Sequence, residues 1–326
     1  MISIEQIKQP IKEEFNFFEI AFSEAFQSNN EILKAVGNYV LQNKGKRIRP
    51  ILTLLSAKIC GTPNKTTING AVSMELLHTA SLIHDDIVDD TFERRGRKSV
   101  NAVWKNKIAV LAGDYLLSKA LGVANETKNF EVLNDMTNLG KELAEGELLQ
   151  ISNTQNISID ENKYFEMIIK KTATLFSTCT KIGALSVNAN EEKIKTLQKF
   201  GEIYGTCFQM RDDVFDYISS EKEIGKPVGN DIREGKITLP LLYALNNNSD
   251  NTSREKYLNI FKAQDFSQSN VEELISFAKK SGGIEYAERK MQEFEKEAIR
   301  LIEPFSENET KTALLMALRH TIERTF

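Results

Sequence analysis

The sequence predicts an all-α protein in which many helices form one large bundle. Apolar residues recur three and four positions apart, as in Leu76, Ala80 and Ile83, and this spacing places them on one face of a helix. No stretch alternates apolar and polar residues for more than a few positions, so strands are not expected. Only six prolines and 17 glycines interrupt 326 residues, and most of them lie between the periodic segments. These observations together predict long helices separated by short breaks.

We expect about 12–13 helices on this periodicity. Ser158 and Glu161 have the spacing of a capping box, which predicts a helix start near residue 160, after a polar break over 152–156. No linker separates two folding units, so we predict one domain over residues 1–326. The predicted helices cover residues 3–28, 30–43, 47–60, 66–91, 99–124, 127–152, 160–187, 191–220, 236–247, 253–263, 269–281, 283–303 and 307–324.

Composition and charge exclude several classes of partner. The net charge is −4, so the chain has no general basic surface for nucleic acid or anionic membrane. No stretch reaches the ~18 uninterrupted apolar residues of a transmembrane segment, and residues 1–30 do not resemble a secretory signal. Cys60, Cys179 and Cys207 lie in apolar contexts without CxxC spacing, which predicts reduced core thiols. We expect a cytoplasmic protein.

Two aspartate motifs of the same design are the most informative feature of the chain. They are Asp85-Asp86-Ile87-Val88-Asp89-Asp90 and Asp212-Asp213-Val214-Phe215-Asp216. Residues four apart, such as Asp85 and Asp89, share a helix face, with Cβ atoms about 5–6 Å apart. Carboxylates this close repel each other unless a cation lies between them. Mg²⁺ is commonly held by one or two carboxylates together with waters and substrate phosphates.

The surroundings of both motifs argue against a solvated acidic surface. Mostly apolar or small residues precede each motif, over 78–84 and 204–210, as in helices inside a bundle. We therefore predict a magnesium site for a phosphorylated ligand. The candidate ligands are Asp85, Asp86, Asp89, Asp212, Asp213 and Asp216.

Basic residues at several positions can neutralise the remaining oxygens of a diphosphate. Arginine can bind phosphate oxygens bidentately, whereas lysine acts as a compact point charge. The segment over 45–50 opens a predicted helix, whose N-terminal amides favour an anion. The basic candidates stand in the segments Gly45-Lys46-Arg47-Ile48-Arg49-Pro50, Arg94-Arg95-Gly96-Arg97-Lys98, Lys171-Thr172, Gly225-Lys226-Pro227 and Gly235-Lys236.

On the basis of these aspartate and basic motifs, the chain resembles a trans-prenyl diphosphate synthase of the polyprenyl synthetase family. The resemblance runs from about residue 40 to 240, in the order and spacing of the family, and implies an isoprenoid synthase fold around a central cavity. Besides the segments already quoted, it rests on Glu75-Leu76-Leu77-His78-Thr79-Ala80-Ser81-Leu82-Ile83-His84, Gly113-Asp114-Tyr115-Leu116, Phe208-Gln209-Met210-Arg211 and Val228-Gly229-Asn230-Asp231.

The resemblance implies a reaction and a role for each motif. An allylic diphosphate binds through about three Mg²⁺ bridged mainly by Asp85, Asp89 and Asp212, and ionises to an allylic cation. Isopentenyl diphosphate then attacks through its double bond, and the departed diphosphate commonly serves as the base. Thr172 and Gln209 match positions whose oxygens face the cation, which makes them catalytic candidates together with Lys171. The implied allylic diphosphate ligands are Arg94, Lys171, Gln209, Lys226 and Lys236. The implied isopentenyl diphosphate ligands are Lys46, Arg49, His78 and Arg95.

Two other readings remain open for a chain with these motifs. A class I terpene cyclase also ionises an allylic diphosphate, but its second metal motif normally mixes Asn or Asp with Ser, Thr and Glu. A non-catalytic subunit of a heteromeric synthase would lack one aspartate motif, and both are intact here. Members of the family are usually homodimers, so a homodimer is expected.

The length of the product depends on the helix before the first motif. Leu77, Ala80 and Ser81 lie about one to two turns before Asp85, and no aromatic residue occurs from Pro50 through Thr91. One helical turn rises about 5.4 Å, comparable to one isoprene unit, so a bulky residue there would stop growth early. Its absence favours a C30–C40 product, such as a quinone side chain, with C15–C20 as the alternative.

Overall fold

The computed structural model describes residues 2–42, 45–94, 96–218, 228–247 and 251–324, and these are helical almost throughout. The all-α prediction is confirmed, apart from one two-stranded hairpin. Two of the predicted ligands, Arg95 and Lys226, lie outside the described residues. Within the described part of the chain, no helix combines the length and the apolar character needed to cross a bilayer.

The residues group into two compact units. Unit 1 comprises Met1–Gly140, Leu175–Gly201 and Leu301–Ala317, and unit 2 comprises Lys141–Thr174, Glu202–Arg300 and Leu318–Phe326. Several long helices contribute residues to both units. A single domain over residues 1–326 stays a prediction.

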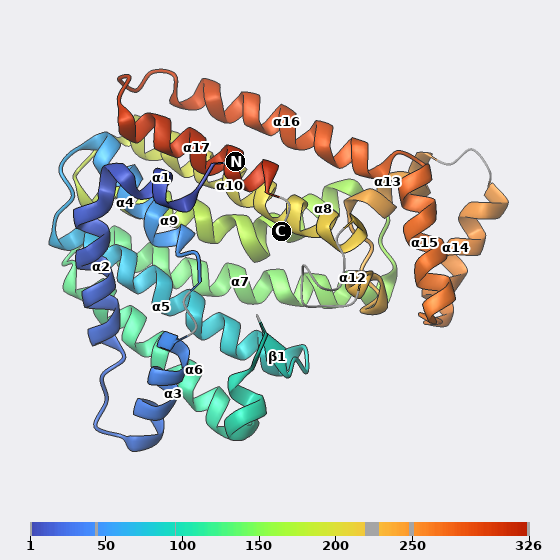
Figure 1. Ribbon diagram of the computed structural model, residues 1–326, viewed down its shortest axis with the longest axis horizontal. Coiled ribbons are helices and arrows are strands. Elements are labelled where there is room, and N and C mark those ends of the chain that lie inside the picture. The colour runs from blue at the N-terminus through green and yellow to red at the C-terminus, as the bar shows by residue number, and fades with distance from the viewer. Residues whose placement is uncertain (1, 43–44, 95, 219–227, 248–250, 325–326) are drawn as a thin grey trace. The chain divides into compact units, whose positions relative to one another are not determined.

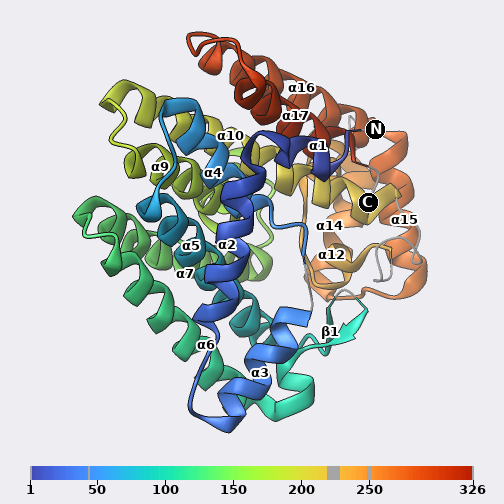
Figure 2. The same ribbon diagram turned by 60° about the vertical axis from the view of Figure 1, so that its left-hand side comes forward.

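Unit 1 is built around two long helices. Helix α5 is buried along most of its length and runs beside α6 (Figure 1), while α2 packs on both α4 and α5 (Figure 2). A Cβ at Gly183 would lie 2.2 Å from the carbonyl oxygen of Thr53, so α9 approaches α4 at a glycine. The helices and strands of this part are α1 Ile4–Lys8, η1 Gln9–Ile11, α2 Lys12–Ala25, α3 Glu31–Gln42, α4 Ile48–Cys60, α5 Lys65–Val88, β1 Glu93–Arg94, β2 Arg97–Lys98, α6 Val100–Glu126, the first part of α7 Phe130–Asn156 and most of α9 Thr174–Ser186.

Unit 2 has its own apolar core. Tyr217, Leu241 and Leu274 are almost completely buried in this core, and α13 packs against α15 (Figure 1). The remaining elements are α8 Glu161–Ile168, η2 Ile169–Ala173, α10 Glu191–Ile218, α12 Asn230–Arg233, α13 Leu239–Asn247, α14 Asn251–Ala263, α15 Gln268–Lys280, α16 Gly283–Ile302 and α17 Glu309–Glu323. Of these, α10 and α17 have their first parts in unit 1, and α16 has its last two residues there.

Three differences from the predicted helices have a clear local reason. The predicted helix 3–28 is divided by η1, which contains Pro10, because proline lacks the N–H that continues a helix. The predicted break over 152–156 is wrong, since α7 continues to Asn156. There, Thr154 Oγ1 and Asn156 Nδ2 donate back to carbonyl oxygens four residues earlier in the helix, so these polar side chains do not end it. Helix α8 is capped by Asp160, which accepts from the backbone N–H of Asn162, rather than by Ser158.

The predicted helix 160–187 contains an unexpected turn. Residues Ile169–Ala173 form a single π-helical turn, η2, between α8 and α9. Turns of this kind are rare and occur frequently at functional sites. This one carries Lys171 and Thr172, two of the predicted catalytic residues.

Candidate active site

The first aspartate motif lies at the C-terminal end of α5 in unit 1. Its middle residue, Asp86, is buried, and its carboxylate accepts a hydrogen bond from Arg94 Nε at 2.8 Å. Asp85 is half-buried and Asp89 is exposed. The Asp89 N–H donates to the Asp85 carbonyl oxygen at 2.8 Å, so both residues lie on the predicted common face. Asp90 is exposed as well, so the motif combines one buried aspartate with three that solvent reaches.

Arg94 belongs to the hairpin that follows this motif. It stands opposite Arg97 in the β1–β2 pairing, and its bond to Asp86 ties the hairpin to the end of α5. Asn101 Nδ2 supports the same turn by donating to the carbonyl oxygens of Asp86 and Thr91. A predicted allylic diphosphate ligand is thus held beside the first motif.

The predicted isopentenyl diphosphate ligands gather at the start of α4 and on α5. Arg47 caps α4 in a left-handed conformation, with φ of 54°, and its Nη1 lies 2.7 Å from Glu75 Oε1 on α5. This ion pair holds the segment with Lys46 and Arg49 against α5. His78, which is buried, follows Glu75 by one helical turn. Unit 1 therefore brings these three candidates to one region.

The second motif lies near the end of α10 in unit 2, and each of its aspartates has a different environment. Asp212 is half-buried and forms an ion pair with Arg324. Asp213 is buried and accepts from Tyr164 Oη at 2.6 Å and from Gln209 Nε2 at 2.8 Å. Asp216 accepts the backbone N–H groups of Asn230 and Asp231, at 2.9 and 3.0 Å, and so anchors the start of α12.

Burial and neighbouring acids leave negative charge poorly compensated around this motif. Burial raises the pKa of Asp213 to about 8, and the nearby Asp231 carboxylate adds to the shift. Burial, followed by Asp231, likewise raises the pKa of Asp216 to about 6. A hard cation close to these carboxylates would relieve both effects, so the donor set fits a divalent ion.

The donor set also indicates how such an ion would be held. Among the described residues, no three His, Cys, Asp or Glu side chains converge on one point to form a closed site. Mg²⁺ usually keeps several waters and takes few protein ligands beside substrate phosphates. Of the six predicted ligands, solvent reaches Asp85 and Asp89 in the first motif and Asp212 in the second.

The π-helical turn links the second motif to the two predicted catalytic residues beside it. Thr172 Oγ1 donates to Gln209 Oε1 at 2.8 Å, while the amide nitrogen of Gln209 donates to Asp213 at 2.8 Å. Because the Gln209 amide nitrogen donates to Asp213, the amide oxygen is directed towards Thr172. The structure thus brings Thr172, Gln209 and Asp213 together.

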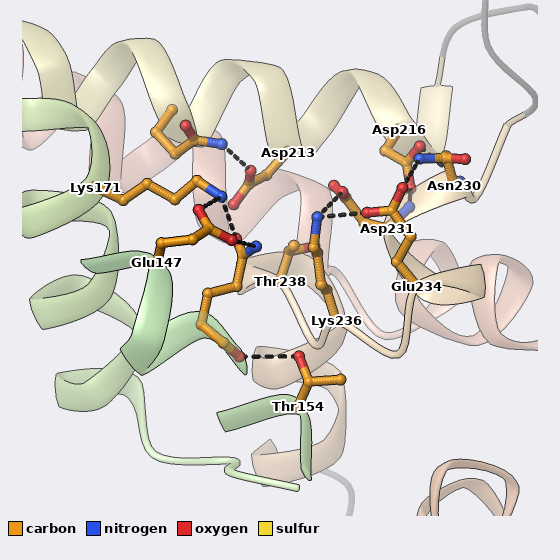
Figure 3. Close-up of polar contacts among 12 residues, drawn as sticks. Glu147, Thr154, Lys171, Asp213, Asp216, Asn230, Asp231, Glu234, Lys236 and Thr238 are labelled. Carbon is orange, nitrogen blue, oxygen red and sulfur yellow. Dashed lines mark hydrogen bonds and ion pairs between the residues drawn. The ribbon is translucent and has the colours of Figure 1, made fainter. Parts of the chain in front are cut away.

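Lys171, the neighbouring residue in the turn, points towards α7. Its Nζ lies 2.5 Å from Glu147 Oε2 and 2.9 Å from Gln150 Oε1. Figure 3 shows Lys171 directed towards Glu147. Glycine at position 146 makes this approach possible, because a Cβ there would lie 2.6 Å from the backbone nitrogen of Lys171.

A cavity of about 140 Å³ lies within unit 2 beside these groups. Lys236, a further predicted ligand, lines it and forms ion pairs with Glu234 and, at 3.9 Å, with Asp231. Most of the residues that line it are polar, and they include Gln150, Thr154, Asp160, Lys171, Thr172, Gln209, Asp213, Asp231, Lys236 and Thr238. Five predicted site residues of unit 2 therefore line one cavity, namely Lys171, Thr172, Gln209, Asp213 and Lys236.

Several residues of this site were not predicted from the sequence. Glu147 and Gln150 bind Lys171, Tyr164 binds Asp213, and Arg324 binds Asp212. The only local signal was Gly146 inside a predicted helix, which indicates a close approach of another backbone. The identity of each partner depends on tertiary packing.

Comparison with known proteins identifies the family. The sequence pattern of the family described as "Polyprenyl synthetase" matches residues 30–278. An octaprenyl diphosphate synthase of Haemophilus influenzae is 33% identical over 299 residues, which cover 92% of this chain and 90% of that protein.

Solved structures agree over nearly the whole chain. A geranylgeranyl pyrophosphate synthase from Bacteroides thetaiotaomicron is 40% identical with a TM-score of 0.86, covering 99% of this chain and 100% of that one. A polyprenyl synthase from Caulobacter crescentus, complexed with calcium and isoprenyl diphosphate, is 28% identical with a TM-score of 0.92, covering 99% and 98%. The fold is accordingly that of the isoprenoid synthases, and the chain belongs to the polyprenyl synthetase family as a trans-prenyltransferase.

Proposed function

We propose that this enzyme elongates an allylic diphosphate, such as farnesyl or geranyl diphosphate, by head-to-tail condensation with isopentenyl diphosphate. The observation that carries the proposal is the arrangement in unit 2, where Lys171, Thr172 and Gln209 meet at one cavity next to the second aspartate motif. A cationic group and two oxygens at one site suit a substrate that separates into a diphosphate and a carbocation.

The family uses a divalent metal for diphosphate ionisation, and we propose that the metal here is Mg²⁺, about three ions by family resemblance. Among the six aspartates predicted as ligands, Asp85, Asp89 and Asp212 are the ones that solvent reaches, so we assign them as direct ligands. Bound Mg²⁺ would neutralise the charge that develops on the departing diphosphate. Asp86, Asp213 and Asp216 were also predicted as ligands. Their protein donors suggest that they chiefly hold the surrounding structure in place.

We propose that one set of side chains binds the allylic diphosphate and that another set binds isopentenyl diphosphate. Arg94, Lys171 and Lys236, together with Lys226, bind the allylic diphosphate, while the oxygens of Thr172 and Gln209 face the allylic cation. Lys46, Arg49 and His78, together with Arg95, bind isopentenyl diphosphate. The support within unit 1 is the ion pair of Arg47 with Glu75, which holds the start of α4 near His78.

We propose an all-trans product of C30–C40. The octaprenyl name of the relative from Haemophilus influenzae and the lack of aromatic residues before Asp85 both favour a long chain. A specific observation favours the shorter C15–C20 alternative, because the relative with 40% identity is a geranylgeranyl pyrophosphate synthase.

We also propose that the enzyme is a homodimer. Four apolar side chains of α6 are at least one-third exposed: Val103, Val110, Leu111 and Leu117. Val110, Leu111 and Leu117 all follow the non-helical residue Lys105, and their spacing of one and seven residues from Val110 keeps them near one face of the helix. An exposed apolar face of this kind is typical of a protein–protein interface.

The proposed reaction is tested with purified enzyme, farnesyl diphosphate and labelled isopentenyl diphosphate. Labelled product should form with MgCl₂ and not with EDTA, and chromatography of the dephosphorylated products reports their length. Release of diphosphate without isopentenyl diphosphate consumption would instead indicate a terpene cyclase.

The two-substrate assignment has its own test. Arg49→Ala and His78→Ala should mainly raise the apparent KM for isopentenyl diphosphate, whereas Lys171→Ala and Gln209→Ala should mainly impair use of the allylic substrate. Equal changes for both substrates in all four variants would contradict the division of residues between the two diphosphates.

A further inference from the structure

Helix α7 approaches the π-helical turn closely at one point. Gly146 faces the backbone of Lys171, where a Cβ would lie 2.6 Å from its nitrogen and 2.9 Å from its Cα. The residues that flank this contact on α7 are Glu147 and Gln150. Their side chains therefore reach Lys171 without extending far from the helix.

Both side chains accept hydrogen bonds from the same ammonium group. Lys171 Nζ lies 2.5 Å from Glu147 Oε2 and 2.9 Å from Gln150 Oε1, and the Glu147 side chain is only 18% exposed. An ammonium has three N–H donors, so these acceptors take two of them. Since Lys171 and Gln150 both line the cavity, the third donor is available to a ligand bound there.

The preceding lysine offers a comparison on the same two helices. Lys170 Nζ binds Glu145 at 2.8 Å and lies 3.6 Å from Glu142. Neither Lys170 nor Glu145 lines the cavity. Two adjacent lysines thus have acidic partners on α7, but of these two lysines only Lys171 lines the cavity.

We propose that Glu147 and Gln150 are positioning residues, which hold the Lys171 ammonium at the edge of the cavity before the allylic diphosphate binds. The inference rests on the proposed role of Lys171 in binding that diphosphate. Lysine is long and flexible, so an unrestrained ammonium loses much conformational freedom when it binds a ligand. Two acceptors fixed on a rigid helix restrict it beforehand, which favours binding and the correct orientation of the substrate.

The test compares Glu147→Ala, Glu147→Gln and Lys171→Ala, with Glu145→Ala as the matched control from the Lys170 pair. Glu147→Ala should raise the KM for farnesyl diphosphate about 5- to 10-fold, the effect of losing one charge-assisted hydrogen bond. The KM for isopentenyl diphosphate should stay unchanged. Glu147→Gln keeps an acceptor oxygen and should recover most of the loss, and Glu145→Ala should behave like the unmodified enzyme.

A double-mutant cycle separates positioning from a merely structural role. If Glu147 acts through Lys171, Glu147→Ala should have no further effect in a Lys171→Ala background, whereas a general structural defect would add to it. Additive effects would therefore overturn the proposal. So would a lowered KM for farnesyl diphosphate in Glu147→Ala, because Glu147 would then compete with the diphosphate for Lys171.

The same measurements distinguish failure of the inference from failure of the proposed function. If Lys171→Ala leaves the KM for farnesyl diphosphate unchanged, the assignment of Lys171 to the allylic diphosphate is wrong, and the inference falls with it. If Lys171→Ala impairs the allylic substrate but Glu147→Ala does not, only the positioning role is wrong.

Discussion

Arg324, the last described residue of the chain, forms an ion pair with Asp212, the first aspartate of the second motif. Its guanidinium also lies 4.3 Å from the centre of the Phe208 ring and donates to the Phe208 carbonyl oxygen at 3.2 Å. The side chain of Arg324 is only 12% exposed. The carboxylate of Asp212, a proposed metal ligand, is therefore already paired with an arginine that lies far away in the sequence.

Replacing Arg324 should make Asp212 easier for a metal ion to bind. We expect Arg324→Met to lower the Mg²⁺ concentration for half-maximal activity about fivefold, equivalent to ~1 kcal/mol for a partly exposed ion pair. Magnesium titrations of turnover measure this shift. Arg319→Met is the control, because Arg319 pairs with Glu295 rather than with a motif aspartate. An unchanged or higher magnesium requirement would show that Arg324 does not compete for Asp212.

A methyl group at position 146 should push α7 away from the π-helical turn. Gly146→Ala is expected to destabilise the protein by about 1–3 kcal/mol, the usual cost of overpacking, and to raise the KM for the allylic substrate. The control is Gly140→Ala on the same helix, where a Cβ meets no atom within 4 Å. That change should be neutral or slightly stabilising, because alanine favours helix more than glycine does. Thermal unfolding of the two variants checks the difference, and equal melting temperatures would contradict it.

Neighbouring aspartates of the first motif should respond differently to substitution. Asp85→Ala should leave the melting temperature nearly unchanged but reduce turnover at least ~10³-fold, several kcal/mol of transition-state stabilisation. Asp86→Ala leaves Arg94 without its buried partner and should also destabilise the fold by about 1–3 kcal/mol. Circular dichroism melts and isopentenyl diphosphate incorporation measure both effects. Near-normal turnover of folded Asp85→Ala would remove Asp85 from the metal site.

Bulky residues before the first motif should shorten the product. Leu77 and Ala80 are each 2% exposed, and the Ser81 hydroxyl donates to the His78 carbonyl oxygen. If the growing chain runs along this helix, Ala80→Tyr and Ser81→Phe should shift the product towards C15–C20. Leu77→Phe, one turn deeper, should stop growth later. Chromatography of the dephosphorylated products measures their length in variants whose melting temperatures are unchanged. An unchanged product length in all three variants would place the growing prenyl chain along another helix.

The thiol of Cys60 should react slowly in the folded protein. Burial raises its pKa from 9.0 to about 11, although Lys193 opposes the shift. The reactive thiolate fraction at pH 8 is therefore about 100-fold below that of an ordinary cysteine, and reactivity should rise about tenfold per pH unit up to pH 11. Burial also raises the pKa of Cys179, to about 12. Thiol titration with a chromogenic disulfide before and after unfolding checks this, and rapid labelling of the folded enzyme would contradict it.

The sequence by itself determined the helical fold, most helix boundaries and the family. These features are local, because helix periodicity and the spacing of Asp85 and Asp89 depend on residues within one or two turns. The two aspartate motifs, together with the order of the basic segments around them, were enough to identify the resemblance to the family. Segments with competing local signals were less predictable. The polar run over 152–156 looks like a break, but it continues α7 because its side chains donate to carbonyl oxygens of the preceding turn.

The tertiary structure alone decided how the site residues are held. Lys171 and Gln150 are separated by 21 positions, and Arg324 and Asp212 by 112, so no sequence period relates them. The π-helical turn and the burial of Asp213 likewise arise from packing around α7, α8 and α10. Local sequence therefore selected the chemical groups, whereas long-range packing selected their partners, because a hydrogen bond depends on distances in space that helix periodicity does not specify.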